Sequence, residues 1–221
     1  MKFVIEYLII PIYISIHISN NYINSDTVNN LQKYKPIGCR DNKTLKLLMN
    51  KGIDAYFSGC LTTTLDIDYG VDDSKRNDEI VFVDYNFGNF DKADQYLYSL
   101  KAYNFSKIIN ITHHFNLTDE HLNRFKNSKN LLDRYARAKL VVTTRLYAAL
   151  PCLALHTPVI LINKNYDSDR FLGLYELLNS IGENSEGKFE IRVNLNEKGL
   201  VYNSDKYLQY ANKLKDSLKN I

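Results

Sequence analysis

A strand, helix and strand unit over residues 138–162 constrains the fold of this chain more than any other stretch. Residues 140–142 form an apolar run typical of a buried parallel strand, and polar residues 143–145 follow it directly. Residues 146–155 predict a helix whose alanines allow close approach to a sheet, and residues 159–162 predict the next strand. In such a unit, ligands bind at the carboxyl end of the strand, where the helix begins.

Arg145 stands at that predicted helix start, directly after Thr143 and Thr144. A cation at a helix N-terminus has the wrong sign for the helix dipole. Something negative nearby would resolve the conflict, and an anionic substrate is one candidate.

Strands and helices alternate along the rest of the chain. Helices are expected at 26–34, 42–51, 92–102, 119–138, 170–180 and 204–218, and strands within 10–18 and at 36–39, 53–57, 79–85 and 107–112. Asp41 is a candidate N-cap, and Gly52 and Gly182 are candidate helix ends. The pattern predicts an α/β fold, a Rossmann-like parallel sheet with helices on both faces.

Three segments are expected from this order. Residues 1–35 would be the end of an N-terminal half or a leading strand and helix. Residues 36–203 would be the Rossmann-like domain, and residues 204–221 a C-terminal helix that packs back on it.

Composition narrows the function classes. A net charge of +3 without a Lys/Arg cluster does not predict a nucleic-acid partner, and neither a G-x-G-x-x-G nor a Walker motif is present. Three widely spaced cysteines form neither a disulfide framework nor a metal motif, so we expect buried thiols, no metal and a reducing, cytoplasmic location. Glu6 interrupts the apolar N-terminus, so no integral membrane span is predicted. The oligomeric state is left open.

Polar side chains follow several predicted strands, and the carboxyl ends of parallel strands face one crevice. They are Arg40, Asp41, residues 58–64, His113, His114 and residues 143–145. The planar guanidinium of arginine presents pairs of N–H donors that match carboxylate and phosphate groups. Arg40 and Arg145 together could therefore hold a ligand that carries a carboxylate and a phosphate. For Arg40, an ion pair with Asp41 is the alternative.

For each of the remaining candidate site residues, a structural role is the alternative to ligand binding. Hydroxyls within 58–64, among them Ser58 and Thr62, could bind an anion or cap a helix. Adjacent histidines in a strand point to opposite faces, so at most one of His113 and His114 should face the crevice. The other histidines, His17, His121 and His156, are expected to be structural or exposed.

At these residues the chain resembles the polysaccharide pyruvyl transferase family. The matching stretches are 36–44 (PIGCRDNKT), 52–62 (GIDAYFSGCLT), 131–138 (LLDRYARA), 141–154 (VVTTRLYAALPCLA) and 157–160 (TPVI). They occur in the family's order and extend over about residues 10–162.

The resemblance implies a fold like the C-terminal half of a GT-B glycosyltransferase, with a shortened N-terminal half. It implies an enzyme of exopolysaccharide biosynthesis that transfers the enolpyruvyl unit of phosphoenolpyruvate to two hydroxyls of a saccharide acceptor, giving a pyruvate ketal without a cofactor. By match to the family's Arg-Asp-x-x-Thr and Thr-Ser-Arg-Leu-His motifs, Arg40 and Arg145 would bind the donor. Asp41, Ser58, Thr62 and Thr144 complete the expected substrate-binding set.

One departure from the family pattern concerns proton transfer. The family usually has His where this chain has Tyr147, and that His looks like the general acid/base. Tyrosine, with a reference pKa near 10, donates a proton but is a poor base at neutral pH. Tyr147 and His113 are therefore the candidate catalytic residues. A GT-B glycosyltransferase that uses a nucleotide sugar, and a non-catalytic remnant of the family, are the alternatives.

Overall fold

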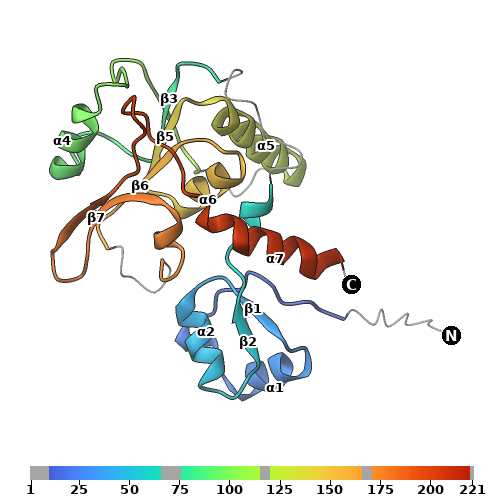
Figure 1. The fold of residues 1–221 in the computed structure, drawn as a ribbon. Coiled ribbons are helices and arrows are strands. Elements are labelled where there is room, and N and C mark those ends of the chain that lie inside the picture. Colours follow the sequence, from blue (N-terminus) through green and yellow to red (C-terminus); the bar gives the residue numbers. More distant parts are fainter. Residues whose placement is uncertain (1–9, 66–75, 115–119, 166–170, 220–221) are drawn as a thin grey trace.

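The computed structural model describes residues 10–65, 76–114, 120–165 and 171–219, and its centre is a six-stranded sheet (Figure 1). The strands are β3 (Ile80–Val83), β4 (Ile108–Ile111), β5 (Leu140–Thr143), β6 (Val159–Asn163), β7 (Asn179–Glu183) and β8 (Phe189–Arg192). Their order in the sheet is β4-β3-β5-β6-β7-β8, and every neighbouring pair is parallel except β7 and β8. The carboxyl ends of β3, β4 and β5 therefore lie together.

Helices cover both faces of this sheet, which confirms the predicted Rossmann-like class. In β3, Val81 and Val83 belong to a core that includes residues of α5 (His121–Arg137) and α6 (Leu146–Ala154). Ile80 and Phe82 alternate with them and pack on the side of α4 (Asp91–Ser99). This period of two is what a strand buried on both faces requires.

A small unit stands apart from the large sheet (Figure 1). Its strands β1 (Ile37–Cys39) and β2 (Ala55–Phe57) form a two-stranded parallel sheet of their own. The helices α1 (Ser25–Lys33) and α2 (Asn42–Met49) belong to the same unit, which has a separate apolar core. The predicted boundary at residue 36 thus falls inside a packed unit, because β1 pairs with β2 and not with the strands that follow.

Residues 10–18 do not form the buried strand that their alternation predicted. Ile16 makes one isolated parallel bridge to Cys39, and Ile10 is 70% exposed. The backbone of Ser15 has a positive φ of 56°, which breaks the extended conformation. The segment still borders β1, since the amide of Gly38 donates to the carbonyl of Tyr13 at 2.8 Å.

The helix predicted over 170–180 is wrong within the described residues. A short 3-10 turn, η4 (Tyr175–Leu177), leads instead into β7, so Gly182 lies in a strand. Residue 170 lies outside the described residues. The leucines and Tyr175 in this segment have the spacing of an amphipathic helix, which is why a helix was predicted. The structure instead buries β7 between β6 and β8, and β8 was not predicted.

The C-terminal helix α7 (Leu208–Lys219) forms, preceded by the turn η5 (Asp205–Tyr207). The ring of Tyr210 meets the ring of Phe57, the last residue of β2, edge-on at 4.9 Å. The turn η2 (Leu61–Thr64), which follows β2, contacts α6 and α7. The helix α7 also adds Ala211 to the core of the large sheet. α7 therefore braces the junction between the two units.

One further prediction is confirmed by the structure. All three cysteines are buried free thiols, as expected. Within the described ranges, none of the helices is both long and apolar enough to cross a membrane.

Candidate functional site

A pocket of about 300 Å³ lies where β4 and β5 end and α6 begins. Its lining residues are His113, His114, Thr144, Arg145, Leu146, Tyr147 and Phe171. Four of the predicted site residues, His113, Thr144, Arg145 and Tyr147, thus meet in one place. They do so because parallel pairing brings the carboxyl ends of neighbouring strands to the same edge.

Both adjacent histidines line this pocket, which corrects the expectation that at most one would face the crevice. The expectation assumed that they continue a strand. β4 ends at Ile111, and residues 112–114 have no strand geometry, so the alternation of faces does not extend to His113 and His114.

Asp84 is the residue that the sequence analysis missed. It follows β3, and its carboxylate accepts hydrogen bonds from the Thr112 hydroxyl at 2.6 Å, the His113 amide at 3.3 Å and Arg145 Nε at 2.9 Å. Burial alone would raise the pKa of Asp84, but these hydrogen bonds and the charge of Arg145 hold it below its usual value. Its place at the end of a predicted strand was the available signal.

The electrostatic conflict at the start of α6 is resolved by this carboxylate. Arg145 Nε pairs with Asp84, and Arg145 Nη2 lies 2.6 Å from Nε2 of His114. Because a guanidinium only donates, His114 Nε2 is the acceptor, which leaves the proton of a neutral His114 on Nδ1. Among the described residues, Nη1 of Arg145 has no such partner, so its N–H groups can meet a ligand in the pocket.

The lowered pKa of Asp84 predicts a pH dependence of stability. Its ionised form stabilises the fold above the unfolded-state pKa of about 3.9, and this contribution is lost as pH falls through the lower folded-state value. We expect the free energy of unfolding to fall more steeply below pH 4 in the wild type than in Asp84→Asn. Urea unfolding at pH 5, 4 and 3 measures it, and parallel slopes would contradict the assignment.

His113 is a half-buried residue of the pocket lining. Its Nε2 contacts the hydroxyl of Tyr135, a residue of α5, and the two rings stack with centroids 6.0 Å apart. Burial lowers the pKa of His113, an effect that the charge of Asp84 opposes and the charge of Arg145 reinforces. The imidazole is therefore neutral at neutral pH, and because Tyr135 occupies Nε2, Nδ1 is the nitrogen that can accept a proton.

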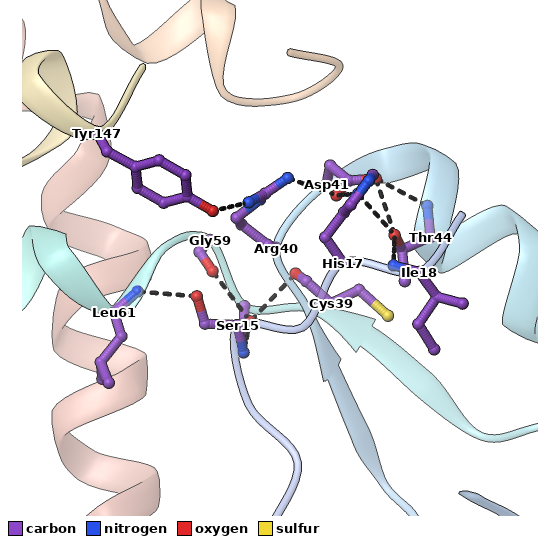
Figure 2. A network of polar contacts seen from close by, with 11 residues as sticks. Ser15, His17, Ile18, Cys39, Arg40, Asp41, Thr44, Gly59, Leu61 and Tyr147 are labelled. Carbon is purple, nitrogen blue, oxygen red and sulfur yellow. Dashed lines mark hydrogen bonds and ion pairs between the residues drawn. The ribbon is translucent and has the colours of Figure 1, made fainter. Parts of the chain in front are cut away.

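Arg40 comes from the small unit and reaches this site through Tyr147 (Figure 2). Its side chain is buried, Nη1 donates to the Tyr147 hydroxyl, and the guanidinium carbon lies 5.5 Å from the centre of the tyrosine ring. Nη2 lies 3.6 Å from Oδ2 of Asp41, which is the ion pair considered as the alternative for Arg40. Nε and Nη2 have no hydrogen-bond partner among the described residues.

The Asp41 carboxylate forms its hydrogen bonds with neighbouring groups of the protein (Figure 2). As the predicted N-cap of α2, it accepts from the amide and hydroxyl of Thr44 at 2.9 and 3.0 Å. His17 Nδ1 lies 2.7 Å from its other oxygen. This geometry favours a structural role for Asp41 over contact with a substrate.

Ser58 and Thr62 are also engaged away from the pocket. The Ser58 hydroxyl oxygen accepts from the Ser15 amide at 3.1 Å, and the Thr62 hydroxyl lies 3.1 Å from the sulfur of Cys60. Neither residue lines the pocket beside α6. The structure thus separates these two candidates from Arg145.

Most of this chain matches the model of a known protein family. A family model described as polysaccharide pyruvyl transferase matches residues 8–166. The chain belongs to this family. Searches of curated proteins and of solved structures found no significant match. The polysaccharide pyruvyl transferase match includes the small unit with Arg40 and every pocket residue except Phe171, and membership in this family implies a saccharide acceptor.

Proposed function

We propose that this chain transfers the enolpyruvyl group of phosphoenolpyruvate to hydroxyls of a saccharide, forming a pyruvate ketal on a glycan. The observation that supports it is the Arg145 guanidinium, fixed on one edge by Asp84 and His114, in a pocket that also holds Tyr147. Phosphate and carboxylate are the groups that a guanidinium binds best. Arg145 would contact the donor directly, and buried Arg40 would add positive charge behind Tyr147.

Proton transfer can be assigned to groups that border this pocket. A guanidinium cannot accept a hydrogen bond, so in the Arg40–Tyr147 contact the phenol oxygen is the acceptor. The phenol proton is then free to point elsewhere, and Arg40 would stabilise the phenolate left after its transfer. Tyr147 would protonate the methylene carbon of phosphoenolpyruvate, while neutral His113 would accept the proton of the attacking sugar hydroxyl.

The overall step balances with these roles. One sugar oxygen bonds to the central carbon of the enolpyruvyl unit, and the methylene carbon becomes a methyl group. A second sugar hydroxyl then displaces inorganic phosphate, which closes the ketal. The proton of this second hydroxyl would restore the Tyr147 phenol, and the proton held by His113 would leave with the phosphate. Leu146 and Phe171 line the pocket and would form an apolar wall beside the reacting carbons.

Removal of the Arg145 side chain tests donor binding. We expect Arg145→Ala to weaken phosphoenolpyruvate binding by about 10- to 100-fold, since a hydrogen bond to a charged group contributes about 1.5–3 kcal/mol. Isothermal titration calorimetry measures the change. Arg192→Ala is a matched control, because its side chain is similarly exposed (45% against 43%) and does not line the pocket.

The same calorimetric titration, repeated with a nucleotide sugar, distinguishes between the candidate functions. No heat with wild-type protein and phosphoenolpyruvate would refute the proposed function, and heat with a nucleotide sugar would then favour a glycosyltransferase. Tyr147 in the place of the family's usual His favours one further candidate, a non-catalytic binding protein. Donor binding without turnover, in both wild type and Tyr147→His, would support that candidate.

A further inference from the structure

We propose that Asp84 is a positioning residue that fixes the Arg145 guanidinium for donor binding. This inference rests on the proposed function, because it assigns to Asp84 the orientation of the group that would hold phosphoenolpyruvate. Asp84 lies outside the stretches that resemble the family and was not among the polar residues predicted at the strand ends.

Asp84 joins the ends of three neighbouring strands. Its own amide donates to the Ile111 carbonyl of β4 at 3.1 Å, and its carbonyl accepts from the Thr144 hydroxyl, after β5, at 2.9 Å. One carboxylate oxygen accepts from Thr112, and the other accepts from His113 and Arg145. Every strand end that borders the pocket is thus tied to this one residue.

The backbone of Asp84 has an unusual conformation that directs its side chain. Its φ of 51° lies in the left-handed region, which residues other than glycine rarely adopt, although aspartate tolerates it better than most. This turn follows β3 directly and places the carboxylate across the ends of β4 and β5. A glycine would adopt the same backbone more easily, so the side chain is what an aspartate adds here.

The contact with Arg145 is made on one edge only. The Asp84 carboxylate accepts a hydrogen bond from Nε of Arg145. The Arg145 side chain remains 43% exposed, whereas the Asp84 side chain is 11% exposed. A partly exposed ion pair of this kind adds little to stability, but it removes rotamer freedom from a long side chain. His114 restrains Nη2, so Nη1, which has no such partner among the described residues, is the part of the guanidinium that we expect to bind a ligand in the pocket.

A double-mutant cycle separates positioning from a merely structural role. Calorimetric titration with phosphoenolpyruvate would compare wild type, Asp84→Asn, Arg145→Ala and the double variant. We expect Asp84→Asn to weaken binding on the order of tenfold and to add less than about twofold in the Arg145→Ala background. Asp84→Gly should lose as much phosphoenolpyruvate affinity as Asp84→Asn, although glycine removes the strain of the positive φ at this position. Additive losses, or full affinity in Asp84→Gly, would overturn the inference.

A second readout needs no ligand. Hydrogen exchange of the Arg145 Nε–H, followed by nitrogen-15 NMR at constant pH, should be at least severalfold faster in Asp84→Asn than in the wild type. The control Asp78→Asn removes an exposed carboxylate 3.2 Å from Lys139 Nζ and should leave this rate unchanged. If the wild type does not bind phosphoenolpyruvate, the proposed function fails, while the exchange rate still decides whether Asp84 fixes Arg145. An unchanged rate overturns the inference.

Discussion

Replacing Tyr147 by Phe lowers the rate of phosphate release from phosphoenolpyruvate in the presence of saccharide acceptors by about 10²- to 10⁴-fold, the usual contribution of a general acid. The variant keeps the aromatic ring that packs near the Arg40 guanidinium and loses only the hydroxyl that Arg40 contacts. Phosphoenolpyruvate affinity should change less than about threefold, because Arg145 retains its contacts with Asp84 and His114. Calorimetry and a phosphate-release assay on the same preparations measure both quantities.

Tyr202→Phe is the matched control for this experiment. Tyr202 is 49% exposed, close to the 46% of Tyr147, and lines a different pocket near the residues that precede β5 and β6. It should retain wild-type turnover. If Tyr147→Phe also retains turnover, the proton comes from another group, and Tyr147 serves only to orient Arg40.

Removing the carboxylate of Asp41 should cost the fold about 3–5 kcal/mol, because it leaves the buried Arg40 guanidinium without its neighbouring anion. The same change removes the N-cap of α2 and the partner of His17. Urea unfolding of Asp41→Ala at pH 7 measures the loss of free energy.

The exposed Asp78, which pairs with Lys139, provides the comparison for Asp41. Asp78→Ala should change the free energy of unfolding by about 0.5 kcal/mol or less. A loss below about 1 kcal/mol in Asp41→Ala would show that water reaches Arg40 once the carboxylate is gone. Arg40 would then be more accessible to a ligand than its burial indicates.

The contact between Arg40 and Tyr147 shows that the site depends on the relative position of the two units. Arg40 follows β1 of the small unit, whereas Tyr147 lies in the first turn of α6 on the large sheet. α7 braces the same junction through Tyr210 and Phe57. A change in the relative position of the units would separate Arg40 from Tyr147, and the phenol would lose its cationic neighbour.

Local patterns were sufficient for much of the fold. Alternating apolar runs and polar breaks marked β3 to β6 and α4 to α7 within a few residues, because burial on both faces of a parallel sheet demands such runs. The N-cap at Asp41 was also readable, since an aspartate before a helix has a local partner three residues later. Arg145 and Tyr147 were located by the polar break between β5 and α6.

The amino-acid sequence by itself determined the α/β class, the buried thiols and the cluster at the start of α6. Only the tertiary structure decided which strand ends become neighbours. The order β4-β3-β5 brings Asp84 beside Arg145, 61 positions further along the chain, and β7 forms where helical spacing predicted otherwise. Local periodicity records which side of an element is buried, whereas strand order and the placement of Arg40 behind Tyr147 depend on contacts between distant residues, which no short pattern contains.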